Sequence, residues 1–265
     1  MSKKVVVITG GTSGIGLEAA KALVAQGCKV YELSRRGEGA DGRIAHIQAD
    51  VTDEGQVQAA VQEIADREGR IDVLINNAGF GISGAVEFTE TADAQRQFDV
   101  NFFGMVRVNR AVLPIMHRQG CGRILNMSSV AAPIAIPFQT YYSAAKAAID
   151  SYTMALANEV RPFGITVCAV RPGDIRTGFT AARVKSAAGD DVYQGRISRS
   201  VARMEKDEQG GMDPQKAGNC VCKMALKAHP KPLTAIRPDY QFFCFLAKVL
   251  PCRLLNRLIG MLYAG

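Results

Sequence analysis

Apolar and polar residues alternate along the first two thirds of the chain in two kinds of stretch, short apolar runs and longer amphipathic segments. Val5–Thr9 is a continuous run of mostly β-branched residues, the composition expected of a strand buried on both faces of a parallel sheet. Comparable runs predict five further strands at Lys29–Ser34, Ile44–Ile47, Ile71–Ile75, Gly122–Met127 and Ile165–Val170. Pro232–Arg237 is the candidate for a final edge strand.

The segments between these runs have the apolar spacing of helices. In Asp53–Glu68, Val57, Val61 and Ile64 recur on one helical face. Pro114 is the position at which a long helix would kink. Further helices are predicted at Leu17–Gln26, Ala92–Gln119, Gln139–Phe163 and Pro214–His229. The alternation of strands and helices predicts an α/β fold with parallel strands.

A glycine-rich turn joins the first predicted strand to the first helix. Its sequence is Gly10-Gly11-Thr12-Ser13-Gly14-Ile15-Gly16. Glycines let the backbone turn sharply and approach a pyrophosphate, and the N–H groups at the helix N-terminus favour an anion there. Glycines alone often mark only a tight turn, but the strand before them and the helix after them favour a dinucleotide-binding site.

The end of the second strand bears on the choice of dinucleotide. Ser34, Arg35 and Arg36 follow one another there, and the nearest acid, Glu32, lies two residues before the strand ends. In dinucleotide folds a carboxylate near this point holds the ribose 2′-hydroxyl, whereas arginine pairs with a 2′-phosphate. The pattern predicts NADP(H) rather than NAD(H), unless the two arginines belong only to a solvated loop.

Two neighbouring stretches contain a phenol, an ammonium and hydroxyls that together can move a proton on and off a carbonyl oxygen. Tyr142 and Lys146 share one helix face, which Tyr141 does not share with Lys146. Ser128 and Ser129 follow a predicted strand at its carboxyl end, where open α/β sheets bind ligands. Lowering a tyrosine pKa by about three units takes about 4 kcal/mol, which an ammonium and a positive cofactor ring can supply. Taken alone, the Tyr and Lys pair is more simply an exposed helix pair.

Amide side chains recur near the same edge of the predicted sheet. Asn76-Asn77-Ala78-Gly79 follows the fourth strand, where small amide residues can tie strands together and leave room for a cofactor, although purely structural roles explain them equally well. Asn101 lies in the middle of the helix predicted from Ala92. An amide inside a helix competes with the backbone for hydrogen bonds, so on this ground alone Asn101 is expected to be structural.

Composition limits the other classes of function. The 265 residues, 48% of them hydrophobic, can form one domain around one large core. The net charge of +7 arises in residues 183–265, with 14 Lys/Arg and 7 Asp/Glu, but the charges are mixed and lack aromatic interleaving, so no nucleic-acid partner is expected. Seven scattered cysteines and three separated histidines predict no metal site and a reduced protein. The chain runs directly into its first strand without room for a signal peptide, so we expect a cytoplasmic location.

The last stretch, residues 240–265, is apolar but interrupted by basic residues. Only 11 residues precede Pro251, and Lys248, Arg253 and Arg257 interrupt the remainder, so it lacks the roughly 20 apolar residues of a membrane span. The stretch is predicted to be an amphipathic extension. Packing on its own domain or on another subunit is the simplest interpretation; covering a bulky apolar substrate or peripheral contact with a membrane are the alternatives.

Taken together, the motifs resemble those of the short-chain dehydrogenase/reductase family. The resemblance covers about residues 4–178 and rests on Thr9-Gly10-x-x-x-Gly14-x-Gly16, Asn76-Asn77-Ala78-Gly79, Asn101, Ser129, Tyr142-x-x-x-Lys146 and Pro172-Gly173, in this order. It implies a Rossmann-like, doubly wound parallel sheet of about seven strands in three α/β/α layers. It also implies a substrate lid at about residues 178–212 within a single domain.

The resemblance further implies a role for each motif residue. Tyr142 is the general acid/base, and Lys146 lowers its pKa and binds the nicotinamide ribose. Ser129, preferred over Ser128 because it lies 13 residues before the tyrosine, positions the substrate oxygen, and Asn101 holds a water in the proton relay. The implied cofactor-binding residues are Gly10, Thr12, Ser13, Gly14, Ile15, Gly16, Ser34, Arg35, Asp50, Val51, Asn77, Ala78, Gly79, Tyr142, Lys146, Pro172, Gly173, Ile175 and Thr177.

The activity expected from this resemblance is an NADP(H)-dependent interconversion of a secondary alcohol and a ketone, on a hydrophobic substrate such as a steroid or another lipid-like molecule. The extension is loosely similar to that of family members acting on steroids and retinoids. The alternatives are a 3-oxoacyl or sugar/polyol carbonyl reductase, and an NADP(H)-binding regulator without chemistry. A homo-oligomer, dimer or tetramer, is implied through the helices Ala92–Gln119 and Gln139–Phe163.

Overall fold

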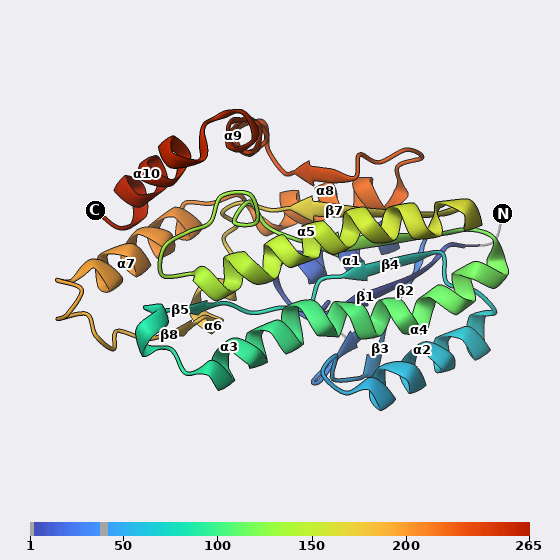
Figure 1. Cartoon of the computed structure of the whole chain (residues 1–265). Helices are drawn as coiled ribbons and strands as arrows, with labels where there is room; N and C mark the ends of the chain where they lie inside the picture. Colours follow the sequence, from blue (N-terminus) through green and yellow to red (C-terminus); the bar gives the residue numbers. More distant parts are fainter. Residues whose placement is uncertain (1–2, 38–41) are drawn as a thin grey trace.

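A parallel β-sheet lies at the centre of the molecule, whose computed structural model describes residues 3–37 and 42–265 (Figure 1). Met1 and Ser2, which precede the first predicted strand, lie outside the described residues. Seven strands pair in parallel within the described part of the chain, in the spatial order β3 (Ile44–Gln48), β2 (Lys29–Ser34), β1 (Val5–Thr9), β4 (Val73–Asn76), β6 (Gly122–Met127), β7 (Ile165–Arg171) and β9 (Leu233–Ala235). The strand order reverses between β1 and β4, which confirms the predicted doubly wound α/β fold.

Helices cover both faces of this sheet. One face packs on α2 (Glu54–Glu68), α4 (Gly104–Gln119) and α5 (Thr140–Val160), and the other on α1 (Gly14–Ala25) and α8 (Pro214–Leu226). Alternate residues of β1 enter opposite layers, since Val5 and Val7 belong to one core cluster and Val6 and Ile8 to the other. Burial on both faces explains why this strand is apolar throughout rather than alternating.

The long helix predicted at Ala92–Gln119 is interrupted, but not at Pro114. It consists of α3 (Thr91–Phe98), a π-helical segment, η2 (Asp99–Phe103), and α4, which continues through Pro114. A π-helical turn inserts one extra residue into the helical ladder and is often found at functional sites. The prediction placed the irregularity at the proline, whereas the structure has it around Asn101.

The segment after β7 contains more regular structure than its polar sequence suggested. Its elements are α6 (Phe179–Ala182), β8 (Val184–Lys185) and α7 (Arg196–Gln209). β8 pairs in parallel with β5 (Ile82–Ser83), forming a separate two-stranded sheet that was not predicted, because strands of two residues have no detectable periodicity. Short 3₁₀ turns complete the fold at η1 (Val86–Phe88) and η3 (Arg161–Phe163).

The C-terminal extension folds as two helices, α9 (Pro238–Val249) and α10 (Cys252–Tyr263), at one edge of the molecule (Figure 1). α9 packs beside β9, and α10 packs on α7. A break at Pro251 separates the two helices, because proline lacks the N–H needed to continue the first. Among residues 3–37 and 42–265 there is no helix whose length and apolar content would allow it to cross a membrane.

Candidate active site

A cavity of about 840 Å³ opens where the strands β1, β2, β4, β6 and β7 end. This is the carboxyl edge of the sheet, beside the reversal of strand order, where open α/β sheets bind their ligands. All the predicted cofactor-binding residues line the cavity, and so do Ser129, Tyr142 and Lys146. Neither Asn101 nor Tyr141 is among the lining residues.

The glycine turn leaves its backbone open towards this cavity. Gly14 has φ +54°, a left-handed conformation that residues with a Cβ rarely adopt. A Cβ on Gly16 would lie 2.4 Å from the Asn77 side chain and from the Gly10 carbonyl. Asn77 Nδ2 donates to that carbonyl at 2.8 Å, which fixes the turn against the end of β4. The result is a cradle of exposed backbone at the start of α1 that fits a dinucleotide pyrophosphate.

Glu32, the acid near the end of β2, is turned away from the cavity. Its side chain is buried, its Oε1 accepts the Gly11 N–H at 3.1 Å, and its Oε2 lies 2.6 Å from His46 Nδ1. Arg35 and Arg36 line the cavity, whereas Glu32 does not. The carboxylate is therefore held against the glycine turn, and Arg35 and Arg36 are the charged residues that line the cavity at the end of β2.

Tyr142, Lys146 and Ser129 meet at the other end of the cavity. Lys146 Nζ lies 5.5 Å from the centre of the Tyr142 ring and donates to the Met127 carbonyl at 2.7 Å. Ser129 lies close enough to Tyr142 to lower the pKa of its hydroxyl, and Ser129 Oγ accepts the Ala131 N–H at 3.1 Å. Ser128 instead donates to the Lys146 backbone carbonyl at 3.2 Å. Of the two serines, Ser129 is thus the one whose hydroxyl faces the phenol.

The electrostatics of this end determine which groups hold protons. Burial raises the pKa of Tyr142 to about 12, while the hydrogen bond with Ser129 and the positive charge of Arg183 oppose that rise. Burial lowers the pKa of Lys146 to about 8, and the charge of Asp150 opposes that fall. At neutral pH the phenol is therefore protonated and can donate, and the lysine beside it is mostly an ammonium.

Asn101 is placed differently from the other three catalytic candidates. It is 2% exposed, its Nδ2 donates to the Phe80 carbonyl at 2.8 Å, and its Oδ1 accepts the Phe80 N–H at 2.9 Å. Both ends of the amide are thus bound to the loop that follows β4. The structure brings Asn101 beside the cavity wall and not into it, and its predicted water-holding role stays a prediction.

Several cavity residues were not singled out from the sequence. The Phe179 ring lies 5.8 Å from the Tyr142 ring, and the Arg183 guanidinium stacks on Phe179 at 5.6 Å. Arg183 is buried and forms an ion pair with Glu208 of α7, which also accepts from Thr180 Oγ1 at 2.6 Å. No spacing rule connects residues this far apart in a polar segment. The only signal available was that they fall in the predicted lid.

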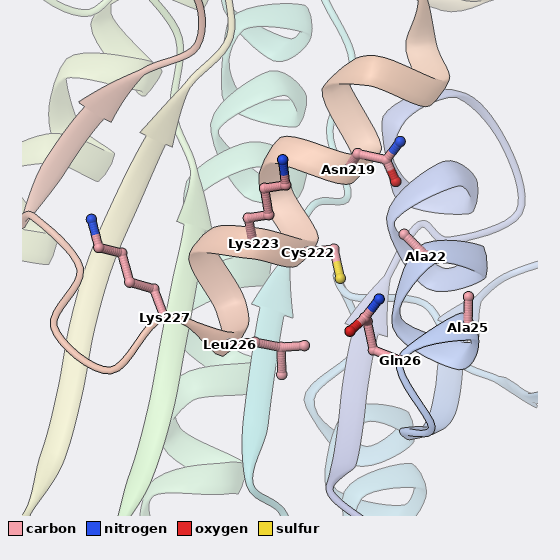
Figure 2. Close-up of a pocket in the computed structure, with 8 residues that line it drawn as sticks. All are labelled: Ala22, Ala25, Gln26, Asn219, Cys222, Lys223, Leu226 and Lys227. Carbon is pink, nitrogen blue, oxygen red and sulfur yellow. The ribbon is translucent and has the colours of Figure 1, made fainter.

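A second hollow, of about 600 Å³, lies between α1 and α8 (Figure 2). Its lining residues are Ala22, Ala25, Gln26, Asn219, Cys222, Lys223, Leu226 and Lys227. They come from the last turns of the two helices, and helices that connect parallel strands end at the amino edge of the sheet, opposite the carboxyl edge. Burial also raises the pKa of the Cys222 thiol, which disfavours a reactive thiolate. We assign this hollow no chemistry.

Comparisons with known proteins identify the family and the fold. A family profile described as short chain dehydrogenase matches residues 4–188. The chain is 39% identical to 3-ketodihydrosphingosine reductase of Bacteroides thetaiotaomicron, an alignment that covers 100% of this chain and 99% of the relative. The crystal structure of a short-chain dehydrogenase from Streptomyces avermitilis matches with a TM-score of 0.84 and 32% identity, covering 99% of this chain and 95% of that one.

Two further solved structures contain a nicotinamide dinucleotide. ElxO with NADP bound matches with a TM-score of 0.75 and 27% identity, covering 91% of this chain and 100% of ElxO. The 3-ketoacyl-(acyl-carrier-protein) reductase of Brucella melitensis, complexed with NADH, matches with a TM-score of 0.74 and 26% identity, covering 88% of this chain and 96% of that one. Proteins of this fold therefore bind dinucleotides of both kinds.

Proposed function

The chain belongs to the short-chain dehydrogenase family of oxidoreductases, and from that premise we propose that it uses NADP(H) to interconvert a ketone and a secondary alcohol. The observation that most supports this activity is the meeting of Ser129, Tyr142 and Lys146 in one cavity with the glycine turn. A neutral phenol there has a hydroxyl partner and an ammonium neighbour. These are the groups that reduction of a carbonyl requires.

In the proposed mechanism, the chemistry that the cofactor supplies when bound is hydride transfer at nicotinamide C4. Tyr142 Oη donates the proton to the carbonyl oxygen as the alcohol forms. Ser129 Oγ, which lies near the phenol, holds that oxygen by a hydrogen bond. Lys146 is held by the Met127 carbonyl and places a positive charge beside the phenolate that the proton transfer leaves.

Preference for NADP(H) belongs to the same proposal. Arg35 and Arg36 are positively charged cavity residues at the end of β2, and Glu32 is engaged with Gly11 and His46. A guanidinium can form bidentate, charge-assisted hydrogen bonds with a 2′-phosphate. A carboxylate in the same place would repel that phosphate. The nearby carboxylate, Glu32, instead accepts the Gly11 N–H and contacts His46.

For the substrate, we propose a hydrophobic, lipid-like ketone. The Bacteroides relative is named for reduction of 3-ketodihydrosphingosine. Ile136, Phe179 and Val184 supply apolar cavity surface, and the Phe179 ring lies 5.8 Å from the Tyr142 ring. Other ketones of the 3-oxoacyl or sugar/polyol class are the alternatives within the family. We further propose a homo-oligomer, since members of this family are commonly oligomeric.

The test is turnover by purified protein with NADPH and NADH against a panel of long-chain, steroid, 3-oxoacyl and sugar ketones. We expect oxidation of NADPH with a long-chain ketone, at a higher kcat/KM than with NADH. Turnover that is faster with NADH would refute the cofactor preference. Tight NADPH binding with no turnover of any ketone would instead indicate a regulator without chemistry.

A further inference from the structure

The two C-terminal helices expose an unusual share of large apolar side chains. Of the 15 large hydrophobic side chains exposed in residues 3–37 and 42–265, eight lie on α9 and α10. Those of α9 are Phe242, Phe243, Phe245 and Val249, between 47% and 57% exposed. Exposed apolar residues on the surface of a soluble protein are normally scattered, whereas a cluster of them marks a docking site.

In α10 the exposed apolar residues share one face. Leu254, Leu258 and Met261 follow the i, i+4, i+7 spacing, and Leu262 lies beside them. Ile259 of the same helix is buried, and α10 packs on α7. α10 thus has one apolar face used by the fold and a second that is exposed. We call the exposed apolar residues of α9 and α10 together the C-terminal apolar surface.

Basic residues border the C-terminal apolar surface. Arg253 and Arg257 are exposed on α10, one turn apart, and Lys248 is exposed near the end of α9. The sequence from residue 238 to the end contains one acid, Asp239, and this acid forms an ion pair with Arg237. The charge around the surface is therefore positive, which is complementary to an anionic partner.

Direct contacts fasten this surface to the wall of the active-site cavity. The Tyr240 hydroxyl of α9 donates to the Asp174 carboxylate and accepts the Asp174 N–H at 3.0 Å. A Cβ on Gly173 would lie 2.2 Å from the Tyr240 ring, so the ring presses on the loop that follows β7. Gly173 and Asp174 line the cavity.

The end of α10 is fastened to the other wall. Arg196 of α7 donates to the Ala264 carbonyl, and Arg199 donates to the Gly265 carbonyl at 3.3 Å. α7 also contains Glu208, which lines the cavity. The C-terminal apolar surface is thus fixed relative to the cavity at both helices.

We propose that the C-terminal apolar surface docks on an anionic lipid bilayer, and that docking holds the active-site cavity near the bilayer so that apolar substrate reaches it from the lipid. Exposed Phe and Leu side chains enter the boundary of the acyl chains, and Lys248, Arg253 and Arg257 remain at the head groups. The second half of this proposal, substrate entry from lipid, rests on the proposed function; the docking itself does not.

A second copy of this chain fits the surface less well than a bilayer does. In a two-fold interface the same patch occurs on both partners, so the basic border of one copy would approach the basic border of the other. Like charges at the rim of such an interface oppose association. With anionic lipids in a bilayer, the same basic residues are attracted to the head groups and favour association.

Docking is tested by co-sedimentation of the full chain with vesicles of phosphatidylcholine, with and without phosphatidylglycerol. We expect binding to the anionic vesicles, and loss of binding in the double variant Phe242→Glu/Phe245→Glu. Phe163→Glu is the matched control, because Phe163 is 49% exposed but lies outside the extension, and it should bind as the wild type does. Replacing Lys248, Arg253 and Arg257 with Gln should weaken binding on the order of 100-fold, since each contact with an anionic surface contributes about fivefold.

Two controls distinguish docking on a bilayer from the proposed chemistry and from contact between copies of the chain. Tyr142→Phe should bind vesicles like the wild type whether or not the proposed chemistry is right. With the wild type as reference, Phe242→Glu/Phe245→Glu should keep its kcat/KM for a short water-soluble ketone and lose turnover of a vesicle-embedded one. Wild-type protein that binds neither kind of vesicle overturns the proposal. If, in addition, the double variant has a smaller oligomer mass than the wild type, the surface is a contact between copies of the chain.

Discussion

At the scale of single residues, the candidate chemistry depends on how burial shifts two neighbouring groups in opposite directions. Burial keeps the Tyr142 phenol protonated and brings the pKa of Lys146 down to about 8. Both shifts favour the neutral form, because a low-dielectric site penalises the charged form of either group. The protein thus holds an ammonium at a position where charge is costly, which is common in sites built for function rather than stability.

Lys146→Met is expected to increase stability at pH 7 while removing activity. The pKa of Lys146 falls from 10.5 to about 8 on folding, so the unfolded chain binds the proton more tightly. Wild-type stability should therefore rise between about pH 8 and 10.5, and the buried charge should cost up to about 3 kcal/mol at neutral pH. Urea unfolding of both proteins at pH 7 and pH 10 measures this. A variant that is less stable than the wild type at pH 7 would show that the ammonium is well compensated.

Ser129→Ala is expected to lower kcat by about 10²- to 10³-fold, the usual loss on removing one hydrogen-bond donor to a reacting oxygen. Ser128→Ala is the matched control, since Ser128 Oγ donates to the Lys146 backbone carbonyl. Its loss should appear mainly as about 1 kcal/mol of stability. Steady-state kinetics together with urea unfolding distinguish the two. Equal kinetic losses for both serines would contradict the assignment of Ser129.

At the scale of elements, the carboxyl ends of the strands and one irregular helix determine where side chains meet. β1, β4, β6 and β7 end at the same edge, so residues distant in sequence line one cavity. The strand bounds were predictable to within about two residues, because a strand buried on both faces leaves a continuous apolar run. The π-helical segment at Asp99–Phe103 was not predictable, since it changes the hydrogen-bond ladder without changing the apolar spacing.

Removing the amide in that segment should cost stability. Asn101→Ala removes the acceptor of the Phe80 N–H and one of the two donors to the Phe80 carbonyl, since Gln97 Nε2 also donates to that carbonyl at 3.1 Å. The loss is expected to cost about 1 to 3 kcal/mol. Asn158→Ala, at an exposed helix position, should stay within about 0.5 kcal/mol. Chemical unfolding compares the two variants. An unchanged stability in Asn101→Ala would mean that the loop after β4 finds other partners.

The end of β2 provides the test of cofactor choice. Arg35→Ser removes a cavity guanidinium, and a hydrogen bond to a charged group contributes about 1.5 to 3 kcal/mol. We expect the Kd for NADPH to rise roughly 10- to 100-fold while the Kd for NADH stays within about twofold. Fluorescence titration of both cofactors gives the ratio. A parallel loss for both would mean that Arg35 does not distinguish the 2′-phosphate.

At the scale of the whole molecule, the sequence predicted the sheet, its helices and the residues at its carboxyl edge, but not how the segment after β7 folds over the cavity. The glycine turn, Tyr142 and Lys146 lie on regular elements, so their order and spacing placed them in one cavity. The contacts among Phe179, Arg183 and Glu208 depend on how a weakly periodic segment folds over that cavity, which local pattern does not encode. The same limit applies to α9, since only the tertiary structure reveals that Tyr240 bonds to the loop after β7.

If Tyr142 is the proton donor of a carbonyl reduction, turnover should depend on its hydroxyl and not on that of Tyr141. The measurement is kcat for NADPH-dependent ketone reduction by Tyr142→Phe, with Tyr141→Phe as the neighbouring control and the NADPH Kd determined for both. We predict a loss of about 10²- to 10⁴-fold in Tyr142→Phe with the NADPH Kd changed little, and activity near the wild type in Tyr141→Phe. A Tyr142→Phe variant that keeps the wild-type kcat would exclude Tyr142 as the proton donor.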